Sequence, residues 1–250
     1  MVESGSPYPV GDPRSDEVRR NLASVRRRIA EACEAAGRTP RDITLVAVTK
    51  FFPATDAALL FRAGVTDLGE SRDQEASVKA RQVAELLDSS SAGPRPRWHF
   101  VGRLQTNKAR SVARYADVVH SVDRLELVAA LAAGAEQAQR SIEVLIQLSL
   151  DGDTSRGGAL ATDLEALADA ISAHDHLILG GVMAIAPMDA DPDEAFSDLA
   201  AASERLRERQ PAASVISAGM SGDLEAAIRQ GATHVRIGTA LLGRRSAQFS

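Results

Sequence analysis

Short apolar runs alternate with amphipathic segments along most of this 250-residue chain. Eight of the runs have the length and the valine-rich composition of β-strands. They cover residues 43–50, 67–70, 98–102, 118–122, 143–150, 178–185, 214–220 and 233–242. Strand and helix alternating eight times predict a parallel sheet closed into a single (β/α)8 TIM barrel. An open doubly wound sheet is the alternative, although neither Gly-x-Gly-x-x-Gly nor Gly-x-x-x-x-Gly-Lys occurs in the chain.

A helix is predicted before the first strand, over residues 15–36, because apolar residues recur at helical spacing from Val18 to Ile29. Ser15 is the expected N-cap, and Gly37 follows the last turn. The other helices are predicted at residues 55–63, 72–87, 106–115, 124–140, 162–173, 193–210 and 222–230. Residues 1–14 are polar and rich in proline and glycine, which predicts a flexible tail. Residues 15–250 then form one barrel domain, with a proline- and serine-rich loop at 88–97.

Composition narrows the classes of function. The net charge is −5, and the one basic run, Arg26 to Arg28, lies among acidic residues, so nucleic-acid binding is not expected. No apolar stretch approaches the roughly 20 residues that cross a bilayer, and the amino terminus lacks a signal-peptide pattern. The single cysteine, Cys33, allows no internal disulfide and fits a reducing compartment. We expect a soluble cytoplasmic protein without a membrane partner, and a monomer because no long apolar surface helix stands out.

Lys50 stands out among the three lysines of the chain because it ends the first predicted strand. Strand ends gather at the rim of a barrel, where barrel enzymes carry their chemistry. A desolvated amine at that rim loses basicity and can form a Schiff base with a carbonyl compound. The alternative is a lysine that ends a strand and extends into water. Lys79 and Lys108 fall in polar helical stretches, where we expect solvated amines.

Two glycine-containing segments follow the last two strands. The first leaves the seventh strand at Ser217 and opens a helix after Ser221, and the second repeats the arrangement with Gly238 and Thr239. Glycine lets backbone N–H groups approach an anion, while a helix N-terminus and hydroxyl groups add further attraction. The segments therefore predict a phosphate site, with helix capping by Ser221 and Thr239 as the alternative.

An amine on the first strand and a phosphate site after the last two strands together fit one cofactor. Pyridoxal 5′-phosphate (PLP) offers an aldehyde to Lys50 and a phosphate to the late segments. Arg236 precedes Gly238 by two residues, a position from which it can reach the ring nitrogen. An arginine there keeps the nitrogen unprotonated and weakens the ring as an electron sink. The alternative for Arg236 is a salt bridge to an acidic residue at the rim.

These segments, together with residues 46–50, 69–71 and 98–108, resemble the pyridoxal phosphate homeostasis proteins, the YggS/PROSC-type PLP-binding family. The barrel of that family is similar to the barrel domain of alanine racemase. The resemblance runs from about residue 43 to residue 244. It implies Lys50 as the Schiff-base residue, Ser221, Gly238 and Thr239 as phosphate contacts, and Arg236 as the neighbour of the ring.

Three positions depart from the family pattern. Ser71 stands where asparagine is common, Arg156 replaces a lysine, and Ala218 replaces a methionine. Ser71 cannot supply the contact that an asparagine amide makes. Arg156 keeps the positive charge but cannot act as a second transfer amine.

The resemblance implies intracellular storage, buffering and delivery of PLP without catalysis, with apo forms of PLP-dependent enzymes as candidate recipients. The alternative is a PLP-dependent, racemase-like enzyme, which needs a second base on the ring face opposite the lysine. The tyrosines are Tyr8 in the tail and Tyr115 in a helical stretch, and His99 at a strand end is more simply a hydrogen-bonding residue. An aldolase-type Schiff base is a weaker third alternative. We expect no metal site, because the five histidines are spread through the sequence.

Overall fold

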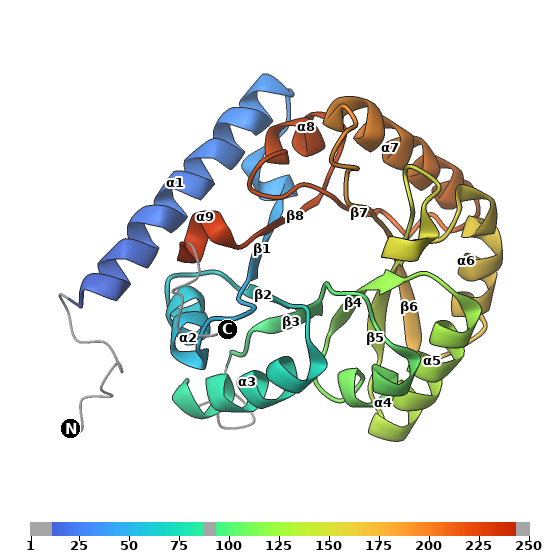
Figure 1. The fold of residues 1–250 in the computed structure, drawn as a ribbon, viewed down its shortest axis with the longest axis horizontal. Coiled ribbons are helices and arrows are strands. Elements are labelled where there is room, and N and C mark those ends of the chain that lie inside the picture. Colours follow the sequence, from blue (N-terminus) through green and yellow to red (C-terminus); the bar gives the residue numbers. More distant parts are fainter. Residues whose placement is uncertain (1–11, 88–93, 244–250) are drawn as a thin grey trace.

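The computed structural model describes residues 12–87 and 94–243 of the chain. In this part, eight parallel strands pair in sequence order and close into a barrel (Figure 1). The strands are β1 (Thr44–Val48), β2 (Asp67–Glu70), β3 (Arg97–Phe100), β4 (Val118–Val122), β5 (Ile142–Gln147), β6 (Leu177–Met183), β7 (Val215–Ser217) and β8 (His234–Ile237). The ring closes where β8 pairs with β1, with Ile237 opposite Ala47. The predicted TIM barrel is confirmed, and an open sheet is excluded.

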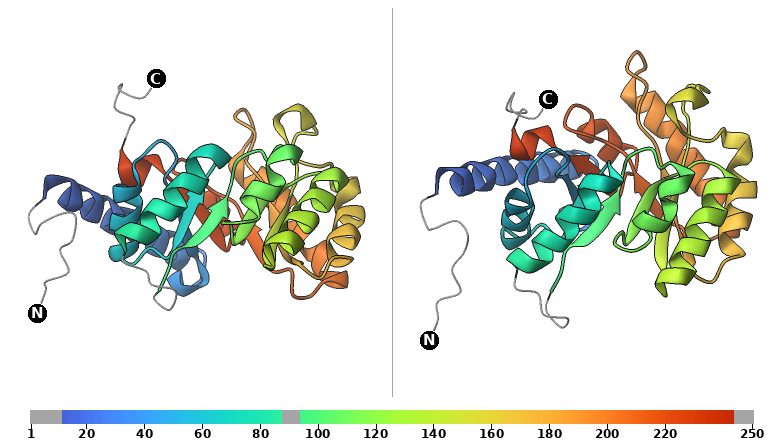
Figure 2. Two further views of the ribbon diagram at one scale, coloured as in Figure 1. Left: turned by 90° about the horizontal axis from the view of Figure 1, so that it is seen from below. Right: turned by 60° about the horizontal axis from the view of Figure 1, so that its bottom comes forward.

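Helices follow the strands and pack around the outside of the barrel (Figure 1). They are α1 (Pro13–Ala35), α2 (Ala54–Arg62), α3 (Asp73–Leu86), α4 (Ala109–Val112), α5 (Leu125–Ala138), α6 (Leu164–Ser172), α7 (Pro192–Arg209), α8 (Leu224–Arg229) and α9 (Thr239–Leu242). The loops after β5 and β6 rise on the same side of the barrel as α9, the side on which the strands end (Figure 2). No helix within residues 12–87 and 94–243 is long and apolar enough to cross a membrane.

Helix α1 is the predicted extra helix, and it lies against α8 and α9 (Figure 1). Its apolar side, from Val18 to Ile29, is buried as predicted. The N-cap is Asp12, whose carboxylate accepts a hydrogen bond of 3.0 Å from the N–H of Ser15. The helix therefore begins at Pro13 and not at Ser15, because proline is well suited to the first helical position. Residues 1–11 of the expected tail and residues 88–93 of the expected loop lie outside the described residues.

The core between strands and helices consists of two apolar clusters. One covers β3 to β7 with their helices, and the other joins α1 and α2 to β1 and β8. The inside of the barrel is different. Because side chains alternate along a strand, Val119 of β4 packs against the helices while Val118 and His120 point inward. A small apolar group of Val118, Leu145 and Met183 lies there beside several polar side chains.

Six of the eight predicted strands differ from the observed strands in extent, and for the last two the physical reason is clear. Residues 239–242 form α9, and β7 covers only the middle of the predicted segment 214–220. A glycine ends the extended backbone in both places. Gly219 has a φ of +88°, and Gly238 approaches β1 so closely that a Cβ would lie 3.2 Å from the carbonyl oxygen of Val48. The predicted strands 67–70 and 118–122 are confirmed to the residue.

Candidate functional site

Lys50 lies just beyond the end of β1, on the face where all the strands end. Its side chain is exposed, and its Nζ lies 6.0 Å from the centroid of the Phe51 ring. The next residue, Phe51, has a φ of +69°, a left-handed conformation that non-glycine residues rarely adopt. The sequence argument expected a desolvated amine at this position. That expectation is wrong, because the chain turns after Thr49 and presents the lysine to solvent.

Lys79 of α3 is buried directly under this turn. Its Nζ donates hydrogen bonds to the carbonyl oxygen of Thr49 (2.7 Å), to Oε1 of Glu70 (2.5 Å) and to Oε1 of Glu75 (2.9 Å). Oε1 of Glu75 also accepts a hydrogen bond of 2.6 Å from the N–H of Phe51. The prediction of a solvated Lys79 is therefore wrong. The polar sequence around Lys79 gave no sign that its amine pairs with the buried carboxylate of Glu70 and the partly exposed carboxylate of Glu75.

The end of β8 lies beside the end of β1. Ile237 pairs with Ala47, and Gly238 then passes close to Val48. Thr239 begins α9 and is exposed. The first N–H groups of a helix have no acceptor within it, so this turn can offer donors to a ligand. The structure thus brings Lys50, Gly238 and Thr239 to one part of the rim.

The segment after β7 forms the next part of this rim. A Cβ on Gly219 would lie 2.6 Å from the Cβ of Ala227, so only glycine fits against α8. Met220 is held by a hydrogen bond of 2.6 Å from its N–H to Oδ1 of Asp223. Ser221 is partly exposed in the following turn, and its carbonyl oxygen accepts a hydrogen bond of 3.1 Å from Arg28 of α1. Helix α8 begins at Leu224, two residues later than predicted.

Ser217 and Arg236 lie inside the barrel and not on its exposed rim. Ser217 is fully buried, and Arg236 is 5% exposed. Nη1 of Arg236 donates to Oγ of Ser217 (2.7 Å), and Nη2 donates to the carbonyl oxygen of Ala184 (2.9 Å). Burial lowers the pKa of Arg236 to about 10, although the charge of Asp223 acts in the opposite direction. No salt bridge to Arg236 occurs within the described ranges, so the alternative of a rim salt bridge is not supported.

Three of the five histidines meet inside the barrel, which corrects the expectation that they are dispersed. The ring centroids of His99, His120 and His234 lie 5.1 to 6.5 Å apart. Nδ1 of His120 lies 2.9 Å from Oγ of Ser217, and its Nε2 lies 2.8 Å from Nδ1 of His99. Nε2 of His99 lies 2.9 Å from Oδ1 of Asp67. In the part of the chain that the structure describes, no group of His, Cys, Asp or Glu is arranged to hold a metal ion.

Sequence reasoning missed this connected group. Each member occupies an inward position of a different strand, and period-two alternation around His99 and His120 could have identified those positions. Which inward residues meet across the barrel could not be predicted, because that depends on the stagger of the closed sheet.

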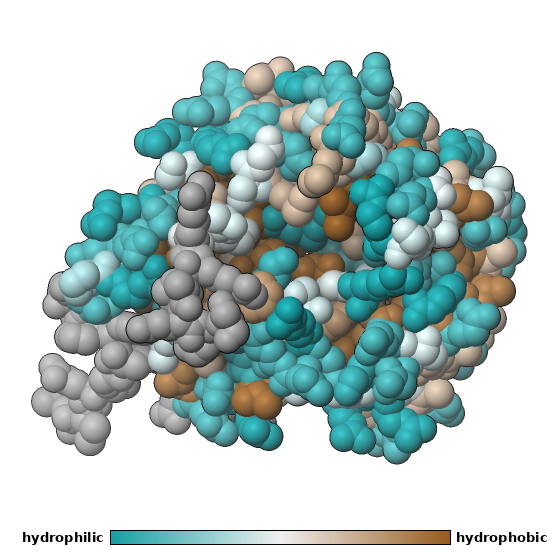
Figure 3. Space-filling model, viewed as in Figure 1, coloured by the Kyte–Doolittle hydropathy of each residue, from teal (hydrophilic) through white to brown (hydrophobic). Residues whose placement is uncertain are grey.

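Basic side chains outnumber acidic ones in the cavity at the rim beside Lys50. The guanidinium carbon of Arg72 lies 4.7 Å from the centroid of the Phe51 ring, which also faces Lys50. A cavity of about 860 Å³ next to the Phe51 ring is lined by Arg72, Arg103, Lys108 and Arg124, together with Asp73 and Ser71. Figure 3 looks onto this face and shows hydrophilic side chains around a central hollow in which hydrophobic side chains are visible.

Arg156, one of the departures from the family pattern, belongs to the loop after β5. It is exposed and pairs with Asp151 and, at 3.1 Å, with Asp153. The expected arginine charge is therefore largely compensated by its own loop.

Comparison with known proteins places this barrel in a class. The family described as alanine racemase, N-terminal domain, matches residues 16–246. The fold and the lysine at the end of the first strand thus define a barrel of the alanine racemase N-terminal type. An alanine racemase from Clostridium difficile shares this fold at a TM-score of 0.68 and 18% identity, over 93% of this chain and 58% of the racemase.

The chain belongs to the pyridoxal phosphate homeostasis protein family. A protein of that name from Mycobacterium tuberculosis is 47% identical over an alignment that covers 98% of each chain. The solved structure of PipY from Synechococcus elongatus, with PLP bound, is 31% identical. It superposes with a TM-score of 0.77 over 90% of this chain and 100% of PipY. The resemblance inferred from the sequence motifs is confirmed.

Proposed function

We propose that this chain binds PLP as a Schiff base on Lys50 and holds it for storage, buffering and delivery. The observation that carries the proposal is the meeting of the first and last strands. The exposed amine of Lys50 follows β1, while Gly238 and Thr239 follow β8, its partner in the closed ring. PLP carries its aldehyde and its phosphate-bearing arm on adjacent carbons of one ring, so it can contact the amine and the phosphate site at once.

The residues of the rim fit this cofactor. Gly238 keeps the path over β1 free of a side chain, and α9 offers N–H groups and the Thr239 hydroxyl to a phosphate. Arg236 lies below them with a buried positive charge. When bound, PLP would supply an electrophilic carbon to the amine, and an arginine near its ring nitrogen would limit the chemistry that follows. PipY, a relative with the same barrel, has been solved with PLP bound.

A carrier role is favoured over racemisation by the position of the described tyrosine. Tyr115 is in contact with both core clusters, and burial raises the pKa of its hydroxyl strongly. It cannot serve as the second base at the rim. Tyr8 lies outside the described residues. We infer that the exposed lysine takes up PLP and releases it to apo-enzymes.

The proposal is tested by adding PLP to the purified protein, recording its visible spectrum and reducing it with borohydride. Peptide mass mapping should locate the pyridoxyl group on Lys50. The Lys50→Ala variant should not form the band, whereas Lys108→Ala, a matched change at the same rim, should form it normally. A pyridoxyl group found on another lysine would overturn the assignment. Racemisation of L-alanine above the rate of free PLP would favour the enzyme.

A further inference from the structure

Hydrogen bonds connect Arg236 to Asp67 through Ser217, His120 and His99. Arg236 can only donate, so the Ser217 oxygen accepts from it. The Ser217 proton has Nδ1 of His120, 2.9 Å away, as its acceptor when His120 carries its own proton on Nε2. Nε2 of His120 then donates to Nδ1 of His99, and Nε2 of His99 donates to the Asp67 carboxylate. In this arrangement Nε2 is the donor nitrogen of both imidazoles.

We propose that Ser217, His120 and His99 are positioning residues that hold the Arg236 guanidinium in one orientation for the cofactor. The proposal rests on the proposed function, in which Arg236 neighbours the PLP ring. Within the described ranges, the Arg236 guanidinium has two hydrogen-bonding partners, Ser217 and the carbonyl oxygen of Ala184. Because the Ser217 hydroxyl is shared with His120, any change in His120 alters the support of Arg236. Ser217 then acts through the arginine and does not contact the phosphate.

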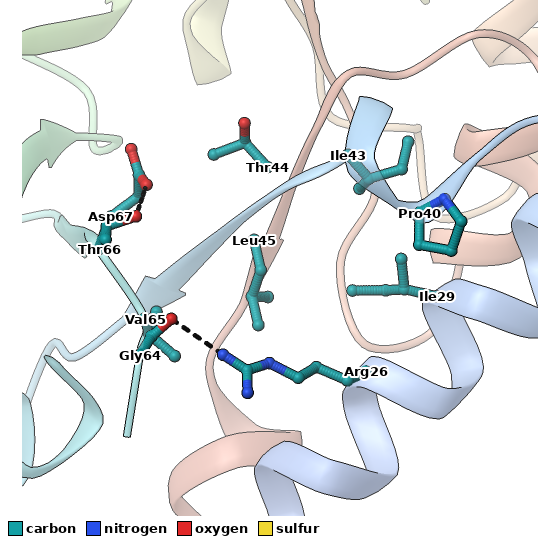
Figure 4. A pocket seen from close by; sticks show the side chains of 10 residues that line it. All are labelled: Arg26, Ile29, Pro40, Ile43, Thr44, Leu45, Gly64, Val65, Thr66 and Asp67. Atoms are coloured by element: carbon teal, nitrogen blue, oxygen red, sulfur yellow. Dashed lines mark hydrogen bonds between the residues drawn. The ribbon is translucent and has the colours of Figure 1, made fainter. Parts of the chain in front are cut away.

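The hydrogen-bond chain ends at Asp67, beside a cavity at the end of the barrel where the strands begin. Asp67 is the first residue of β2 and lines a cavity of about 410 Å³ between α1 and the starts of β1 and β2 (Figure 4). Its side chain is 13% exposed, whereas His99 and His120 are 1% or less exposed. Thr66 donates a hydrogen bond of 2.6 Å to its second carboxylate oxygen. Solvent therefore reaches the acceptor end of the chain, while its centre is dry.

The surroundings of His120 keep it uncharged. Burial lowers its pKa well below the usual range, and His99, Arg236, His234 and Arg97 lower it further. A second proton on His120 would turn Nδ1 into a donor, so the Ser217 hydroxyl would lose its acceptor in this series of hydrogen bonds. The hydrogen bonds from Arg236 to Asp67 are therefore maintained only while the His120 imidazole is neutral.

The first test needs no cofactor. Nitrogen-15 NMR of the histidine side chains in the PLP-free protein at pH 7 should show His99 and His120 neutral, each with its proton on Nε2. Assignment is made with the single variants His99→Gln and His120→Gln. A proton on Nδ1 of either ring, or a doubly protonated ring, would overturn the proposed direction of the chain.

The second test measures the effect on the cofactor. His120→Phe removes both hydrogen bonds and keeps a buried ring, whereas His120→Gln can still accept at one end and donate at the other. Of these two bonds, the one to Ser217 supports Arg236, and its loss should weaken PLP binding to the phenylalanine variant about ten-fold. The glutamine variant should bind like the wild type, and so should His234→Gln, a neighbour outside the chain.

Equal binding by wild type and folded His120→Phe would overturn the proposal, and so would equal weakening in the glutamine variant. If His120→Phe does not fold, the Ser217→Ala variant is used to test the proposal. It should shift the pH midpoint of the bound cofactor's visible band, which a general loss of stability does not move. If the wild type itself does not bind PLP, the proposed function fails, while the NMR result still decides the hydrogen-bond chain.

Discussion

Nζ of Lys79 lies 2.5 Å from Oε1 of Glu70, and these side chains are only 5% and 1% exposed. The same amine donates a hydrogen bond to the carbonyl oxygen of Thr49, and the Glu75 carboxylate accepts one from the N–H of Phe51. A buried ion pair thus fixes the backbone on both sides of Lys50. This support matters because Phe51 adopts a left-handed conformation that costs free energy and needs its surroundings to maintain it.

Replacing Lys79 with methionine should destabilise the protein by about 3 kcal/mol or more, because it leaves the Glu70 carboxylate buried without its charge partner. The turn that carries Lys50 should loosen as well, so PLP should bind more weakly. Urea unfolding measures the first effect, and titration with PLP measures the second.

The double variant Lys79→Met with Glu70→Gln removes both charges and should regain part of the stability. Lys108→Met is the matched control, since that lysine is partly exposed. A Lys79→Met protein as stable as the control would show that the buried pair contributes nothing.

Stability should fall on acidification because of the histidines inside the barrel. An unfolded histidine takes up a proton near pH 6.5, whereas burial lowers the pKa of His234 to about 4 in the folded state. Between these values the unfolded chain binds more protons, so stability is lost as the pH falls from 6.5 to 4. The loss from His234 is at most about 1.4 kcal/mol per pH unit.

Urea unfolding at pH 7 and at pH 5 tests this dependence. His234→Gln should lose less stability between the two pH values than the wild type does. His120 contributes in both proteins, so the comparison isolates His234. Identical pH dependence in the two proteins would contradict the assignment.

Gly219→Ala should destabilise the fold by about 2–3 kcal/mol. The positive φ disfavours any Cβ, and the added methyl group would collide with Ala227. Gly222→Ala is the matched control in the same loop, because a Cβ there meets nothing within 4 Å. Its effect should stay within about 0.5 kcal/mol. Thermal unfolding of the two variants side by side provides the measurement, and equal melting temperatures would refute the packing argument.

The architecture could be predicted from the sequence because each strand and helix has its own local pattern. The valine-rich run of β4 predicts a strand, and the amphipathic spacing of α1 predicts a helix, from local sequence alone. The ends of β7 and β8 were less predictable. There the apolar pattern continues past Gly219 and Gly238, and the position of a neighbouring strand or helix decides where the extended backbone stops.

The positions of site residues that belong to sequence motifs could be predicted, whereas the burial of side chains that depends on tertiary packing could not. Lys50, Gly238 and Thr239 lie together at the rim as the sequence predicted. The burial of Lys79 and the exposure of Lys50 are the reverse of what their local sequences indicate. Those outcomes depend on how α3 packs under the turn after β1, and no pattern within either segment contains that information.

The pairing of β8 with β1 makes the candidate site a property of the finished ring. Lys50 and Thr239 stand near opposite ends of the chain, and they become neighbours only when the last strand joins the first. In the proposed mode of binding, the amine is present in a growing or partly unfolded chain before the phosphate contacts have formed. A PLP molecule held by both would link the first strand to the last and stabilise the closed barrel relative to open forms.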